Sequence, residues 1–202
     1  MRRTIATLIA LLALLQPTTA QGQRFVAGPC IGLAASQVDG DSYAGYHKAG
    51  PIAGLWVEYH TQSAWSAMAK FRYLQKGCRA RGEAPGSTKF ALQLNYLDLQ
   101  LTAIYRLNQR MSLVAGLSGG YLTSLREFNI GGEVPREHTI GLRRYELAAT
   151  AGAHIHLGPR LRAEAAFSYS IIPLMPIAHT IEHWRNKGAR NNVIEISLLY
   201  EL

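Results

Sequence analysis

Residues 161–171 read LRAEAAFSYSI, and this alternation decides the fold. Every odd position from Leu161 to Ile171 is apolar or aromatic, whereas the even positions include Arg162, Glu164 and two serines. Successive side chains of a β-strand point to opposite faces, so the stretch predicts a strand with one apolar face and one charged face. Which of these faces is dry then determines the environment of the protein.

Seven further segments alternate in the same way, and clusters of Gly, Pro, Asn and Asp separate them. The clearest run is LDLQLTAIYR at residues 97–106, preceded by Leu92, Leu94 and Tyr96 in the opposite phase. That change of phase predicts a bulge or an extension beyond a membrane. The eight predicted strands are Phe25–Ser36, Lys48–His60, Trp65–Lys76, Phe90–Arg106, Met111–Ser124, Leu142–Leu157, Leu161–Ile171 and Asn192–Leu202.

The connections between these segments alternate in length. Tight turns are expected at His60–Ser63, Leu107–Arg110 and Gly158–Arg160. Long loops are expected at Ser36–His47, Gly77–Thr88, Leu125–Thr139 and Pro173–Arg190. Short turns at one end and long loops at the other are typical of an outer-membrane β-barrel. The sequence therefore predicts an eight-stranded antiparallel transmembrane β-barrel with both termini on the periplasmic side.

The polar faces of the segments carry charges of both signs, while the apolar faces are almost free of charge at their centres. Eight strands enclose little more than their own side chains, and an unpaired buried charge is costly. We therefore expect acids and bases to pair across a filled lumen. The expected lumen charge network comprises Glu58, Lys70, Arg72, Asp98, Arg106, Arg144, Glu146, Arg162, Glu164 and Glu195.

The N-terminus has the pattern of an export signal. Arg2 and Arg3 precede an apolar run, Ile5–Leu15, and small residues lead to a cleavage site after Ala20. The run is shorter than the roughly 20 residues that a spanning helix needs. We expect residues 1–20 to be a cleaved signal peptide and residues 21–202 to form the barrel domain in the outer membrane of a Gram-negative bacterium.

Composition and charge exclude some classes of function. Hydrophobic residues make up 48% and charged residues 17%, which excludes a disordered chain. The formal net charge is +8. An exported chain rarely meets nucleic acid, so we expect no nucleic-acid partner. The basic side chains are instead expected to contact the anionic head groups of outer-membrane lipid and lipopolysaccharide. A soluble exported barrel, with aromatic residues such as Trp65 and Phe71 lining a ligand cup, is the alternative architecture.

Several motifs resemble those of PorT-like outer-membrane β-barrel proteins. They are Ser36–Gly40 with Gly45-Tyr46, Gly50 and Gly54 before Glu58-Tyr59, Trp65-Ser66 before Tyr73–Gly77, Leu94–Leu99, Tyr105–Leu107, Gly116, Gly120–Leu122 and Asn191-Asn192. Their order covers essentially the whole mature chain. The resemblance implies an outer-membrane barrel, and the family's name implies a link to protein secretion.

No catalytic or cofactor-binding motif emerges, so we expect no cofactor. A lipid A or phospholipid hydrolase or acyltransferase is the alternative function, and it would need Ser, His and an acidic residue together. Ser168 and Glu164 share a strand face with each other, and His154 lies on the same-phase face of the neighbouring strand, but that face is predicted to point inward. His154 and His156, and His179 with His183, are interpreted as polar lumen and loop residues rather than metal ligands.

The last long loop is the best candidate for an interaction site. His183, Trp184, Arg185 and Lys187 place an aromatic anchor among basic side chains. This cluster suits a protein partner, and equally suits packing over the barrel mouth or contact with lipopolysaccharide phosphates. The two cysteines, Cys30 and Cys78, lack metal-ligand spacing, and whether they form a disulfide stays open.

Overall fold

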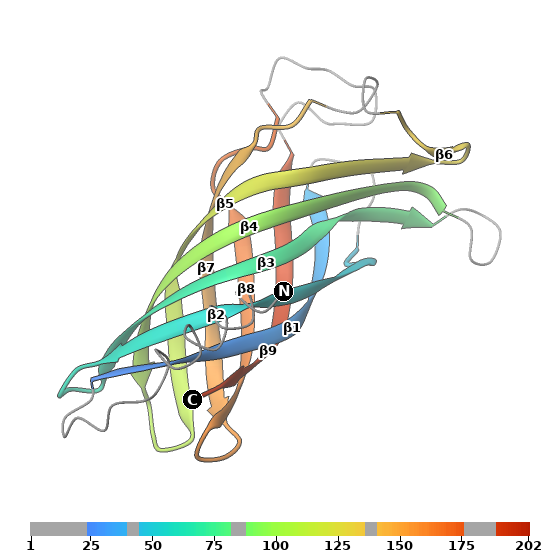
Figure 1. The fold of residues 1–202 in the computed structure, drawn as a ribbon. Helices are drawn as coiled ribbons and strands as arrows, with labels where there is room; N and C mark the ends of the chain where they lie inside the picture. The colour runs from blue at the N-terminus through green and yellow to red at the C-terminus, as the bar shows by residue number, and fades with distance from the viewer. Residues whose placement is uncertain (1–23, 40–44, 82–87, 136–140, 176–188) are drawn as a thin grey trace, which may run out of the picture.

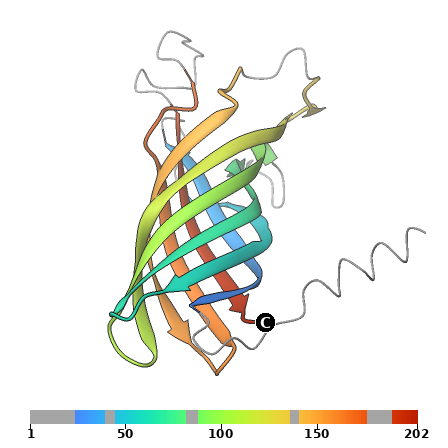
Figure 2. The same ribbon diagram turned by 60° about the vertical axis from the view of Figure 1, so that its left-hand side comes forward.

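The structure, a computed structural model, describes residues 24–39, 45–81, 88–135, 141–175 and 189–202. Within these residues, antiparallel strands close into a β-barrel, which confirms the predicted fold class (Figure 1, Figure 2). None of the described residues forms a helix that is long and apolar enough to span a membrane. The expected signal peptide at residues 1–20 and the loop cluster at residues 183–187 lie outside the described residues.

Eight long strands form the wall, and a two-residue strand adds to the outer end of one of them. The strands are β1 Phe25–Asp39, β2 Lys48–His60, β3 Trp65–Arg81, β4 Thr88–Arg106, β5 Met111–Asn129, β6 Gly132–Glu133, β7 Tyr145–His156, β8 Leu161–Ser170 and β9 Arg190–Tyr200. Each long strand pairs with its sequence neighbour, and the ring closes where β1 pairs with β9. Both described ends of the chain lie at the end of the barrel that carries the short turns (Figure 2).

Side-chain direction follows the predicted alternation. On β8, Arg162, Glu164 and Ser168 are buried inside the barrel, whereas Ala165 and Phe167 are exposed on its outer surface. The outer wall therefore carries the exposed large apolar side chains, as a surface in contact with lipid requires. The dry environment lies outside the barrel, against the charge-free face.

Several strands run further than the sequence indicates, and three neighbouring ones form a common extension. β3 continues to Arg81, β4 begins at Thr88 and β5 continues to Asn129, although residues 77–88 and 125–139 were predicted as loops. Figure 1 shows the outer ends of these strands passing the ends of their neighbours. In this extension β4 still pairs with both β3 and β5, and this pairing stabilises the strands. The two faces of the strands no longer differ clearly in polarity there.

The predicted irregularity in the fourth segment is present, but it lies on the neighbouring strand. Asn95 pairs with Ser124 and Tyr96 with Leu122, so Thr123 is the extra residue on β5. Along β4 the direction of the side chains does not change, because Leu92, Leu94 and Tyr96 point inward like Asp98. The phase change in the sequence arises because the inward side chains of β4 are charged or polar in the middle of the lumen and apolar at its outer end.

Candidate functional site

The barrel interior carries a belt of paired charges between two apolar layers. The charged residues of the belt are all at most 5% exposed: Glu58, Lys70, Arg72, Lys76, Asp98, Glu146, Arg162, Glu164 and Glu195. Each of them lies within 4.0 Å of a residue of opposite charge. A charge desolvated to this degree is tolerated only when it has such partners.

Arg72 is at the centre of the belt and bridges two other strands. Its Nε lies 2.8 Å from Asp98 Oδ1 on β4, and its Nη1 lies 2.5 Å from Glu195 Oε2 on β9. Ser168 Oγ on β8 also donates to Glu195 at 3.0 Å. One guanidinium group therefore connects opposite parts of the wall, which its planar set of five donors makes possible.

A second centre lies on the side of the short turns. Lys70 Nζ contacts both oxygens of Glu164 at 2.5 and 2.6 Å, and His154 Nε2 lies 2.6 Å from Oε2 of the same carboxylate. Below it, Arg162 Nη1 donates to Glu58 at 2.5 Å. The Arg162 guanidinium also lies 4.5 Å from the centre of the Trp56 ring, which places a cation over an aromatic face.

The outer end of the belt is built around Glu146. Lys76 Nζ lies 2.7 Å from its Oε2, and the side chains of Ser170 and Asn191 donate to the same carboxylate. The Lys76 ammonium group also lies 4.5 Å from the centre of the Tyr96 ring. Lys76 was not among the ten predicted network residues, although its even phase on the third segment could have identified it.

Two predicted members of the network lie elsewhere. Arg106 and Arg144 are exposed, so their expected place in the lumen is wrong. Arg106 is the last residue of β4, and Arg144 precedes β7, so each lies at a rim of the barrel where a guanidinium group reaches water. Arg144 Nη1 donates to Tyr121 Oη at 3.3 Å on the outer rim. The alternation gives the side to which a residue points but not its height along the barrel axis.

Apolar side chains close the lumen at both ends of the charged belt. The end with the short turns holds a cluster of Cys30, Trp56, Met68, Ile104, Val114 and Leu199. The end with the long loops holds Val38, Cys78, Leu92, Leu94, Tyr96, Leu122, Leu174, Met175 and Ala189. Leu174 and Met175 follow β8 and enter the barrel mouth, held by a 2.7 Å bond from Leu174 N to Ala189 O.

The closed lumen bears on three arrangements considered from the sequence. Cys30 and Cys78 belong to opposite apolar clusters and are both free thiols, so they form no disulfide in this structure. Ser168 and His154 are both buried inside the barrel, with Ser168 bonded to Glu195 and His154 to Glu164. Among the described residues, no three His, Cys, Asp or Glu side chains gather as a metal ion would require.

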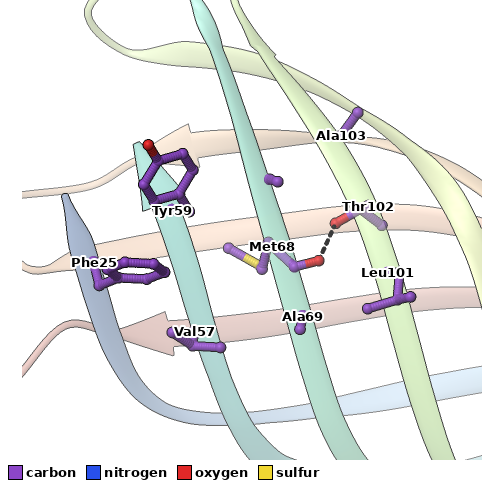
Figure 3. Close-up of a pocket in the computed structure, with 9 residues that line it drawn as sticks. Phe25, Val57, Tyr59, Met68, Ala69, Leu101, Thr102 and Ala103 are labelled. Carbon is purple, nitrogen blue, oxygen red and sulfur yellow. Dashed lines mark hydrogen bonds between the residues drawn. The ribbon is translucent and has the colours of Figure 1, made fainter. Parts of the chain in front are cut away.

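The outer wall has aromatic girdles and shallow grooves. Ring pairs Phe25–Tyr59 and Trp65–Tyr105, at centroid distances of 4.8 and 4.9 Å, mark the rim near the short turns. Between them, small outward residues such as Ala67, Ala69 and Ala103 leave the groove shown in Figure 3, walled by Phe25, Tyr59 and Leu101. Aromatic girdles of this kind lie at the level of the lipid head groups.

The Tyr121–Tyr145 ring pair, with centroids 5.3 Å apart, marks an outer girdle at the other end of the wall. The extension of β3, β4 and β5 rises above this outer girdle and carries basic and polar side chains. Arg79, Lys89 and Arg126 are exposed there, and Arg126 pairs with Glu133 through bonds of 2.7 Å. Lys48, at the outer end of β2 and outside the membrane-spanning part, donates to Gln75 Oε1 at 2.8 Å. Burial, followed by the charge of Arg79, lowers the pKa of Lys48. The candidate site for recognition is thus the end of the barrel opposite the short turns.

Comparisons with known proteins agree with this architecture. The family model described as an outer membrane protein beta-barrel domain matches residues 18–175. No curated protein matches the chain. Among solved structures, the attachment invasion locus protein Ail of Yersinia pestis is similar at a TM-score of 0.54 and 17% identity, covering 89% of this chain and 100% of Ail. Neisserial surface protein A is similar at a TM-score of 0.50 and 11% identity, covering 89% and 98% of the two chains. At these identities the likeness shows the fold alone.

Proposed function

The chain belongs to the outer membrane protein β-barrel family, and from that premise we propose that it is a non-enzymatic surface barrel that recognises a partner through its extracellular face. The observation that supports this proposal is the closed lumen. Lys70, Arg72 and Glu164 are at most 2% exposed, so water-sized molecules do not reach the middle of the barrel. A solute path or an internal active site would need such access, whereas an external binding surface does not.

The extracellular face offers the chemistry that recognition needs. The strands that continue past the membrane hold a rigid sheet above the bilayer, and side chains on a rigid scaffold are well placed for binding. Exposed Arg79, Lys89 and Arg126 lie on this sheet, and Ile130 at its tip is 83% exposed. The loop that carries His183, Trp184, Arg185 and Lys187 is proposed to contribute an aromatic anchor among further cations.

A polyanion is the first ligand class to test. Ail has been solved in complex with a heparin analogue, sucrose octasulfate. The basic side chains on the outer face of this chain are complementary to such a ligand, because guanidinium groups bind sulfate and phosphate oxygens in pairs. A sulfated or phosphorylated surface polymer is therefore the proposed partner class.

A narrower role in protein secretion follows from the motifs that resemble PorT-like proteins. Their ordered occurrence along the chain supports this second proposal. A deletion strain should then accumulate undelivered secreted proteins, and comparison of the culture supernatants of the parent and the deletion strain measures this. Unchanged supernatants would remove the secretion role and leave recognition untouched.

Site-directed photo-crosslinking in intact cells tests the main proposal. A photoreactive residue at Lys89 or Trp184 should capture one surface polymer or one protein, while the same residue at Gln109, in a short turn, should not. Capture of lipid alone from both outer positions would contradict recognition of a partner and would favour packing of the loop against lipopolysaccharide. Hydrolysis or acyl transfer on lipid A by the purified barrel, abolished by His154→Ala or Ser168→Ala, would contradict the non-enzymatic proposal.

A further inference from the structure

A groove in the outer wall lies just below the outer aromatic girdle. It is lined by Phe71, Leu97, Leu99, Gly119, Tyr121 and Tyr145, together with part of Glu146. Gly119 forms its floor, because this residue faces outward between Leu99 on β4 and Leu147 on β7. Two large aliphatic side chains therefore flank a position that has no side chain.

Packing within the chain does not explain this glycine. A Cβ added at Gly119 would meet no atom within 4 Å. At every other glycine of the long strands that the structure describes, the added Cβ would meet backbone or side-chain atoms at 3.0 Å or less. Glycine weakens a strand, and within a strand it often marks a bulge, a tight bend, or close approach of a ligand or another backbone. The ladders of β5 with β4 and β7 run through Gly119 without a register shift, so no bulge accounts for it. The space above Gly119 is therefore open to a molecule outside the barrel.

The end of the groove nearest the long loops is polar and basic. The Tyr121 and Tyr145 rings lie 5.3 Å apart, and Arg144 Nη1 donates to Tyr121 Oη at 3.3 Å. Arg143 and Arg144 are both exposed at this rim. The carboxylate that lines the groove, Glu146, points into the lumen and pairs with Lys76 at 2.7 Å, so it does not neutralise the rim.

We propose that this groove binds a phosphorylated outer-leaflet glycolipid, with one acyl chain over Gly119 and a phosphate at Arg144. The heights agree with this assignment, since aliphatic walls lie below the girdle at the level of hydrocarbon and the guanidinium lies above it at the level of head groups. Arginine is the preferred partner of phosphate oxygens, and a tyrosine hydroxyl that already accepts from Arg144 can donate to the same phosphate. This site is separate from the partner-binding surface proposed above, and it places the extension of β3–β5 among the sugars of neighbouring glycolipids.

The test compares three lipids on the barrel purified from outer membranes in detergent. Bound lipid is counted by native mass spectrometry for bisphosphorylated lipid A, for the same lipid A after removal of its phosphates, and for phosphatidylcholine. We expect lipid A to bind about tenfold more tightly than its dephosphorylated form, because a hydrogen bond to a charged group contributes this much. Equal affinity for the two forms would overturn the proposal.

Matched variants locate the site. Gly119→Leu should fill the groove and lower lipid A binding, whereas Ala151→Leu, at another outward position, should not. Arg144→Gln should remove the preference for phosphate, whereas Arg160→Gln, in a short turn, should keep it. Heat-modifiable gel mobility checks that each variant is folded. Lipid A binding that is the same in Gly119→Leu and Ala151→Leu, or a phosphate preference that survives in Arg144→Gln, would also overturn the proposal.

Discussion

Replacing Arg72 with methionine is the most demanding test of the sealed charged belt. The change removes the guanidinium that lies 2.8 Å from Asp98 and 2.5 Å from Glu195. Both carboxylates are at most 1% exposed, so neither can turn to water. Breaking one buried ion pair costs about 3–5 kcal/mol, and because two carboxylates lose one partner here we expect the free energy of unfolding to fall by about 5 kcal/mol. The remaining 3.0 Å bond from Ser168 to Glu195 moderates this loss.

Urea unfolding of the barrel in lipid vesicles measures the effect, with the fluorescence of buried Trp56 as the signal. At a typical dependence of about 2 kcal/mol per molar urea, a loss of about 5 kcal/mol lowers the midpoint by about 2.5 M. Arg144→Met removes an exposed guanidinium group, so its free energy of unfolding should lie within about 0.5 kcal/mol of that of the parent. This control separates loss of any arginine from loss of the buried one.

A compensated variant separates charge from packing. In Arg72→Met/Asp98→Asn/Glu195→Gln the two carboxylates become neutral amides, so most of the lost stability should return. Equal instability of the single and the triple variant would refute a charge effect, because the loss would then come from the changed side-chain shape. A free energy of unfolding for Arg72→Met within about 1 kcal/mol of the parent would also refute a charge effect, because the two carboxylates would then not depend on Arg72.

Three further predictions follow from the closed wall and the closed lumen. Gly28→Val should abolish the heat-modifiable folded form, because its Cβ would lie 1.7 Å from Tyr200 O, whereas Gly119→Val should fold normally on the same gels. The purified monomer should show no large, steady conductance in planar bilayers, and steady openings would contradict the apolar clusters at both ends. Cys30 and Cys78 should react with a thiol reagent only after the barrel is unfolded, and labelling of the folded barrel would show that one of the apolar clusters is open. Addition of an oxidant or a reductant should leave the urea midpoint unchanged.

The strands could be predicted from the sequence because outward and inward positions face different media. In the run from Leu97 to Arg106, lipid requires apolar side chains at every second residue, and the lumen accepts Asp98, Gln100 and Thr102 in between. Above the membrane this contrast disappears. Arg79 on β3 therefore resembled a loop residue, although its backbone continues the ladder with β4 to Arg81. Strand ends outside the bilayer depend on pairing between strands, which the pattern of a single segment does not contain.

The candidate sites were less predictable than the fold for a related physical reason. Alternation assigned Glu58, Lys70 and Glu164 to the lumen side, where the structure also has them, but it placed Arg106 and Arg144 there too. Both have the inward phase, but they lie at the rims, and only the assembled barrel shows where the rims are. The groove over Gly119 depends on Leu99 and Leu147 from two other strands. A glycine in an alternating strand gives no sign of what its neighbours leave open.

The charged belt also explains how a membrane wall can be exported. The protein lies in the outer membrane, so its chain crosses the inner membrane before it folds. A run of about 20 apolar residues would be retained there as a spanning helix. Strands as long as β4 and β5, with 19 residues each, would come close to that limit if their inward positions were apolar as well. Inward polar residues interrupt such runs, namely the charged Asp98 in β4 and the buried Ser112 and Ser118 in β5. A charged residue at a helix centre costs about 2.5–3.5 kcal/mol during insertion. After folding, the inward charges must be paired and kept from water. Their side chains therefore fill the lumen, and the outer face is left as the surface where the protein can act.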